Sequence, residues 1–164
     1  MAGFSAGIIG AAAVAGLVGF AQPAAAQAFG QGFVYGGPTT VYEGSDAARL
    51  STFGGGGEIL ARNGAGASFD YSLLRIDRAS VNQVSADAIY QKPLAATSAV
   101  SLFAVGGYSG FFSSGGTAHG LNFGGGANLW MSPRVALRIE VRDNVLTTEG
   151  NTQAVSVRFG VTFR

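Results

Sequence analysis

Residues 154–163 read AVSVRFGVTF, so that apolar side chains alternate with small or polar ones along the whole stretch. The valines and phenylalanines stand at odd positions, and the even positions include Arg158 and Gly160. Residues 135–142, VALRIEVR, alternate in the same way. Because successive side chains of a β-strand point to opposite faces, this period of two predicts strands with one apolar and one polar face.

The same period extends back through the chain to residue 29. Residues 119–131 alternate clearly, whereas residues 98–109 are apolar at both parities, so that their facing stays open. Turn-forming residues separate the segments, which are about the length that a membrane-spanning strand needs. The expected strands are eight in number: 29–36, 53–62, 65–76, 83–92, 98–109, 119–131, 135–145 and 152–164.

The connections between these segments alternate in length. Short connections are expected at Asn63-Gly64, a dipeptide typical of two-residue hairpins, and at 92–97 and 132–134. Longer polar or glycine-rich loops are expected at 37–52, 77–82, 110–118 and 146–151. Transmembrane β-barrels have short periplasmic turns and longer outer loops. The expected fold class is therefore all-β, an eight-stranded antiparallel up-and-down transmembrane β-barrel.

Composition excludes several other classes of protein. The 164 residues include 27 glycines and no cysteine, which excludes a disulfide scaffold and a thiolate-bound metal. Ten basic and nine acidic residues leave a net charge of +1, so that no basic surface for nucleic acid is indicated. The length fits one domain.

The first 28 residues have the features of a cleavable signal peptide. They contain no charged side chain, and an apolar run over 8–20 is followed by Pro23 and the small residues 24–26. The apolar run is shorter than the roughly 20 residues of a membrane-spanning helix. We therefore expect a signal peptide at 1–28 and the barrel domain at 29–164.

Charged residues on the polar face indicate which face meets lipid. Four acids and four bases share this face, and such a balance suits a closed interior, because an unpaired buried charge is costly. Apolar residues would then face lipid, whereas a soluble lipocalin-like barrel or sandwich, the alternative, would turn them inward. The predicted interior charge network consists of Glu58, Arg62, Asp70, Asp87, Arg138, Glu140, Arg142 and Arg158.

Aromatic residues at the apolar parity support the lipid-facing interpretation, since aromatic girdles lie at both membrane interfaces. Glycines at the polar parity, such as Gly124, Gly126 and Gly160, would leave room inside for the arginine side chains. Trp130 has inward parity and is expected to fill one end of the barrel. The aromatic residues expected to face outward are Phe33, Tyr35, Phe69, Tyr71, Tyr90, Phe159 and Phe163.

Roughly the last 45 residues resemble the OmpA/OmpX-like family of small outer-membrane β-barrels. The resemblance rests on residues 122–130 (NFGGGANLW), the turn Ser132-Pro133-Arg134, residues 135–143 and the closing residues 157–164. It implies an outer-membrane protein of a diderm bacterium that contacts lipid and, during biogenesis, the assembly machinery. Arg158, Gly160 and Phe163 would belong to the C-terminal assembly signal, although such strands usually end on an aromatic residue and this chain ends on Arg164.

No motif for catalysis, cofactor binding or metal binding is evident. The single histidine, His119, has Leu121 two positions later, where a lipid-deacylating barrel would need a serine nucleophile. The acids Glu43, Asp46, Asp143 and Glu149 are scattered over predicted loops. We therefore expect no cofactor, no nucleic-acid partner and no enzymatic activity.

The sequence thus predicts a non-enzymatic, monomeric outer-membrane β-barrel with a structural or surface-interaction role in the envelope. Loops 37–52 and 110–118 are the expected contact surfaces. The charges around Arg138 and Glu140 would form a plug, or alternatively the constriction of a narrow channel for small solutes. A lipid-modifying enzyme that uses His119 and a soluble periplasmic binder are two further candidate functions.

Overall fold

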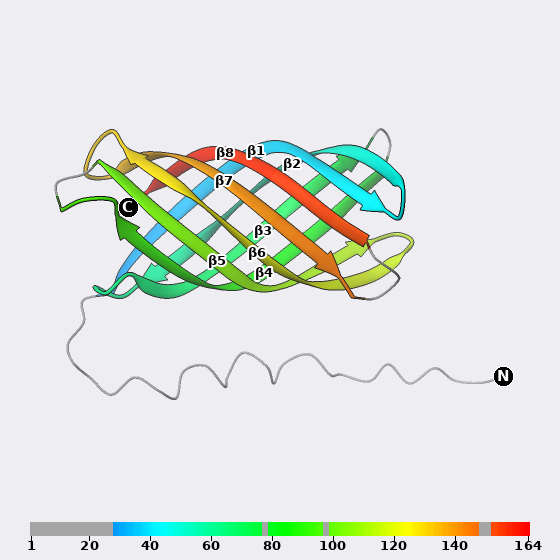
Figure 1. Ribbon diagram of the computed structural model, residues 1–164, viewed down its shortest axis with the longest axis horizontal. Coiled ribbons are helices and arrows are strands. Elements are labelled where there is room, and N and C mark those ends of the chain that lie inside the picture. Colours follow the sequence, from blue (N-terminus) through cyan, green and yellow to red (C-terminus); the bar gives the residue numbers. More distant parts are fainter. Residues whose placement is uncertain (1–27, 77–78, 97–98, 148–151) are drawn as a thin grey trace, which may run out of the picture.

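Eight antiparallel strands form a closed barrel in chain order in the computed structural model, in which β8 also pairs with β1 (Figure 1). The structure describes residues 28–76, 79–96, 99–147 and 152–164. The strands are β1 (Phe29–Glu43), β2 (Asp46–Leu60), β3 (Ala65–Ile76), β4 (Ala79–Pro93), β5 (Val100–Ser113), β6 (Gly116–Trp130), β7 (Val135–Leu146) and β8 (Thr152–Phe163). The predicted fold class is confirmed, whereas the predicted signal peptide lies, apart from Ala28, outside the described residues.

Apolar side chains form a belt on the outer face of the barrel. Phe69 is 55% exposed, and Ile59, Phe123 and Phe159 are exposed to a similar degree. The side chains between them point inward, where most buried residues are polar or charged. This inside-out arrangement is that of a barrel in lipid, because a protein in water buries its apolar side chains instead.

The facing of β1 differs from the expectation, and the prediction that Phe33 and Tyr35 face outward was wrong. Both rings lie inside, 1% and 6% exposed, and Val34 faces outward. The interior accepts these rings because glycine stands beside them: a Cβ on Gly54 would lie 2.8 Å from the Tyr35 ring. Arg138 stacks on Phe33 at 4.4 Å and gives the ring a polar partner.

Two of the predicted long loops are largely strand. Most of residues 37–52 belong to β1 and β2, which are joined at residues 44–45, and most of residues 110–118 belong to β5 and β6, which are joined at residues 114–115. Gly44, with φ at 60°, makes the first of these tight turns possible. β4 similarly begins at Ala79 instead of residue 83.

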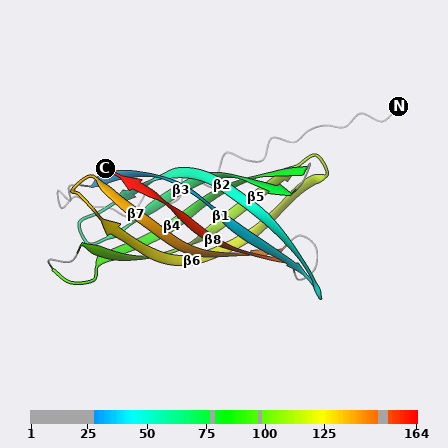
Figure 2. The ribbon, with the colours of Figure 1, turned by 90° about the horizontal axis from the view of Figure 1, so that it is seen from above.

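These added strand residues extend the barrel beyond the apolar belt, at the end opposite the C-terminus (Figure 2). Several outward-facing residues at this projecting end are polar or charged, among them Arg49, Ser51 and Arg75, although Tyr42 and Phe112 are exposed there too. At the other end, the terminal end, exposed Leu94 and Met131 continue the apolar surface into the turns. The projecting end therefore lies in water while the rest of the outer wall lies in lipid.

Glycine at inward positions generates a prediction about folding. A Cβ on Gly160 would lie 2.0 Å from the Val34 carbonyl oxygen, whereas a Cβ on outward-facing Gly57 would meet nothing closer than 3.8 Å. We expect Gly160→Val to lower the free energy of unfolding by at least about 1–3 kcal/mol through overpacking. Gly57→Val, the control, should leave it unchanged.

The measurement is urea unfolding in detergent, followed by the gel mobility of unboiled against boiled samples. Wild type and Gly57→Val should both migrate differently before and after boiling, as a detergent-resistant barrel does. Equal unfolding midpoints for Gly160→Val and Gly57→Val would contradict the close approach of β8 to β1.

Candidate functional site: the charged centre of the barrel

Seven charged side chains from five strands meet inside the barrel, because each stands at an inward position of its strand. All seven are buried. The inward parity of β7 alone supplies three of them, at every second position. The group, which we call the charged centre, consists of Glu58, Asp70, Asp87, Arg138, Glu140, Arg142 and Arg158.

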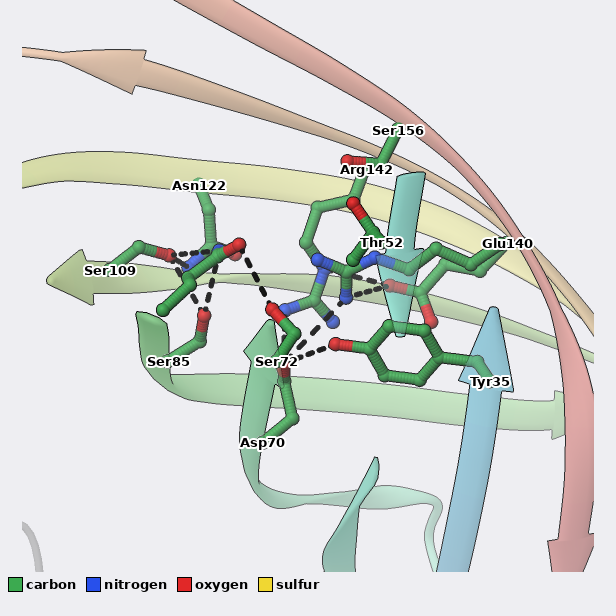
Figure 3. A network of polar contacts seen from close by, with 12 residues as sticks. Tyr35, Thr52, Asp70, Ser72, Ser85, Ser109, Asn122, Glu140, Arg142 and Ser156 are labelled. Carbon is green, nitrogen blue, oxygen red and sulfur yellow. Dashed lines mark hydrogen bonds and ion pairs between the residues drawn. The ribbon is translucent and has the colours of Figure 1, made fainter. Parts of the chain in front are cut away.

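Arg142 holds three carboxylates at once (Figure 3). Its Nη1 lies 2.9 Å from Asp70 Oδ2 and 2.7 Å from Asp87 Oδ2, and its Nε donates to Glu140 Oε1 at 2.7 Å. Asp70 is on β3, which lies opposite β7 in the strand order of the barrel. The guanidinium therefore bridges the interior from wall to wall.

Arg138 forms a second bridge nearer the terminal end. Its Nη1 lies 2.8 Å from Glu58 Oε1, and its Nη2 lies 3.0 Å from Glu140 Oε2. The guanidinium carbon lies 4.4 Å from the centre of the Phe33 ring and 4.0 Å from that of Phe103. Because these rings come from β1 and β5, on opposite walls, the cation and the two rings fill the cross-section.

Arg158 completes the group with longer contacts. Its Nη1 lies 3.5 Å from Glu140 Oε1 and 3.8 Å from Asp70 Oδ1. The guanidinium also lies 4.5 Å from the centre of the Tyr35 ring. The Tyr35 hydroxyl in turn donates to Asp70 Oδ1 at 2.7 Å, so that the inward aromatic residues support both the cations and the acids.

Arg62, which we expected in this network, lies elsewhere. β2 ends at Leu60, and the backbone turns at residues 61–64, where the Gly64 N–H donates to the Ala61 carbonyl. The Arg62 side chain is exposed in this turn, because the alternation that predicted its inward facing ends with the strand. The charged centre consequently holds four carboxylates and three guanidiniums.

A cation at the terminal end was missed by sequence reasoning. Arg164 stacks on Trp130 at 3.9 Å and on Phe29 at 4.6 Å, and its Nε lies 3.4 Å from Gln31 Oε1. Gln31 also donates to Glu58 of the charged centre. The signal was present in the sequence: the inward residues of β8 have even numbers, and continuing this alternation from Thr162 to Arg164 places Arg164 on the inner side.

Uncharged polar side chains continue the network toward the projecting end. Asn122 donates to Asp87 at 2.7 Å. It also donates to Ser109 at 2.9 Å (Figure 3). Gln83 donates to Asn144 at 3.0 Å, and Ser109 donates to the same amide oxygen at 3.0 Å. These residues carry no charge, so nothing in the sequence pattern singled them out. They connect the walls above the charged centre.

The arrangement is one of paired charges, and the structure gives no grouping suited to catalysis among the residues that it describes. His119 lies on the outward side of β6 and stacks on Tyr108, with ring centres 5.8 Å apart. Its neighbour Leu121 is 59% exposed on the outer face. Among the described residues, no group of three or more histidine, cysteine or acidic residues is placed to hold a metal ion, and no helix is long and apolar enough to cross a membrane.

No family model and no curated protein matches the sequence, but the structure is similar to several solved structures. Neisserial surface protein A (NspA) matches with a TM-score of 0.67 and 16% identity, over 83% of this chain and 97% of that chain. Ail, the attachment invasion locus protein of Yersinia pestis, gives 0.60 and 15%, over 82% and 95%. The N-terminal β-barrel domain of Pseudomonas aeruginosa OprF gives 0.57 and 14%, over 82% and 98%.

The chain has the fold of the small outer-membrane β-barrels. A designed transmembrane β-barrel is similar too, with a TM-score of 0.53 and 16% identity over 81% of this chain and 93% of that chain. Such identities establish the fold and leave the activity open. The apolar belt and this fold together are those of a transmembrane β-barrel.

The bridges of the charged centre predict a large loss of stability when one partner is removed. Arg138→Leu would leave Glu58 and Glu140 buried without this cation, and breaking a buried pair in this way costs about 3–5 kcal/mol. We expect the unfolding midpoint in urea to fall accordingly, and Glu140→Leu to do the same. Arg62→Leu, in the exposed turn, is the control. Wild-type midpoints for Arg138→Leu and Glu140→Leu would refute the network.

Proposed function

We propose that the protein is a non-enzymatic, monomeric outer-membrane barrel whose interior is closed by the charged centre and whose projecting end serves in contacts at the cell surface. The observation that supports closure is the position of Arg142, which bridges carboxylates of β3, β4 and β7. A structural role in the envelope needs no passage through the barrel, and an eight-stranded barrel has an interior just wide enough for side chains to fill.

The alternative of a narrow channel needs a continuous aqueous path between the two ends. Arg138 lies between Phe33 and Phe103, and Arg142 lies between Asp70 and Asp87 a little further along. The contacts of Arg138 and the contacts of Arg142 each join opposite walls of the barrel directly, through protein atoms. An ion crossing the barrel would have to separate these buried pairs, which is expensive in a low-dielectric interior.

Conductance in planar lipid bilayers tests closure. We expect no discrete current steps from the wild-type protein, because the side chains of the charged centre block the interior. The double variant Arg142→Ala/Arg158→Ala removes two of the bridging side chains and should produce steps if it folds, as judged by its gel shift. Wild-type steps as large as those of the variant would overturn the closed interior.

The surface role is supported by where the polar hairpins stand and by the proteins with this fold. The hairpin of β1 and β2 and the hairpin of β5 and β6 project beyond the apolar belt, and they contain the segments 37–52 and 110–118 expected to make contacts. NspA is described as a surface protein and Ail as an attachment invasion locus protein. Ail has also been solved with the heparin analogue sucrose octasulfate, at a TM-score of 0.54 to this chain.

Single cysteines test whether the projecting end faces the medium, since the natural chain has none. Ser114→Cys lies in the exposed turn between β5 and β6, and Ser132→Cys lies in an exposed turn at the terminal end. A membrane-impermeant maleimide added to intact cells should label Ser114→Cys and leave Ser132→Cys unlabelled. Both should be labelled after the cells are broken. The reverse pattern in intact cells would contradict the proposed orientation.

Two further parts of the proposal concern biogenesis and catalysis. Arg158, Gly160 and Phe163 on the closing strand are proposed to be read by the outer-membrane assembly machinery, with Phe163 exposed on the outer face. The absence of enzymatic activity is supported by the lipid-side position of Leu121 beside His119, where a deacylating barrel would need a serine. A lipid-modifying activity lost in His119→Ala would argue for an enzyme instead.

A further inference from the structure

A ring of apolar side chains lines the inside of the barrel at its projecting end, where the interior opens to water. Every strand contributes one inward-facing residue, and none of the eight is exposed. This apolar ring differs from the polar interior below it. Its members are Val41, Leu50, Leu74, Val81, Phe111, Ala118, Leu146 and Ala154.

A hydrogen-bonded floor closes the apolar ring from below. Two positions deeper along each strand the inward residue is polar and buried, except on β6, where it is Gly120. Thr39 bonds to Thr52 at 2.5 Å and donates to Ser156 at 3.0 Å across three neighbouring strands. The remaining floor residues are Ser72, Gln83, Ser109 and Asn144, which are linked to one another by hydrogen bonds.

The apolar ring and residues of the hairpins above it line a pocket of about 590 Å³ that is open at the projecting end, and we call this pocket the cup. Sites for small molecules typically measure about 300–1,000 Å³ and have mainly apolar walls with a few polar groups. The ring offers water few hydrogen-bond partners, so an apolar molecule that covers the ring would remove apolar surface from water. The floor residues, which are joined by hydrogen bonds, lie directly below the ring.

The charge of the lining decides which class of molecule fits. Among the described residues that line the cup, Glu43 has the one charged side chain, and the lining also includes Ser113, Thr117 and Thr152. A carboxylate at the rim repels anionic amphiphiles such as fatty acids. We propose that the cup binds a small, uncharged apolar molecule taken from the medium outside the cell.

Solution NMR of the protein in lipid nanodiscs, with ¹³C-labelled leucine and valine methyl groups, tests this proposal with naphthalene as the probe. Naphthalene also partitions into lipid, so lipid-facing Leu129 and Leu137 report that background. We expect the methyl signals of Leu74 and Val81 in the cup to shift and saturate with naphthalene concentration. The signals of Leu129 and Leu137 should shift linearly.

Variants that fill the cup separate binding from partition. Ala154→Phe places a ring in the cup, and Val155→Phe, one residue along β8, places the same ring on the opposite face of the strand. Saturation should be lost in Ala154→Phe and kept in Val155→Phe. Ala118→Phe fills the cup from β6 and serves if Ala154→Phe fails the gel-shift test of folding.

Three results would overturn the proposal. Linear shifts of the cup methyls with naphthalene would mean that no site exists, and saturation that survives in the folded cup-filling variants would place the site elsewhere. Tighter saturable binding of dodecanoate than of naphthalene would show that the ligand class is anionic. Because the readout is binding in the cup, none of these results depends on whether the charged centre is closed.

Discussion

The interior of this barrel depends on the pairing of buried charges, and Arg142 is the residue on which most of that pairing converges. It contacts carboxylates from three strands within 3 Å. A charge removed from water loses several kcal/mol of solvation, which only close partners restore. The barrel therefore closes with each guanidinium beside carboxylates of other strands, and these contacts hold the strands in one register.

Aromatic rings and glycines give these cations their positions. The rings of Phe33, Tyr35 and Phe103 lie against Arg138 and Arg158, so that the planar guanidiniums are held by stacking as well as by ion pairs. Space for the rings comes from small neighbours: a Cβ on Gly126 would lie 2.7 Å from the Phe103 ring. Glycine is thus a packing requirement of the charged centre.

The chain has opposite alternation on the two sides of the membrane boundary. In lipid the outward residues are apolar and the inward residues polar, as with Ile139 and Arg138. At the projecting end the inward residues are apolar and many outward residues are polar, as with Leu50 and Arg49, although Tyr42 and Phe112 are exposed there. The outer face of the same strands therefore contacts lipid over part of its length and water at the projecting end. The apolar ring of the cup is a consequence of this inversion, since its side chains would otherwise face water on the outer wall.

The amino-acid sequence by itself determined the strand number, the closed barrel and seven of the eight residues proposed for its interior, because a period of two reports the facing of most strands while one face meets lipid. Only the tertiary structure decided the rest. The alternation inverts beyond the lipid, so segments 37–52 and 110–118 have the pattern of loops, and it ends with β2, so the inward facing predicted for Arg62 was wrong. Phe33 and Tyr35 face inward because glycines and arginines of other strands accommodate them, and contacts between distant strands leave no local pattern.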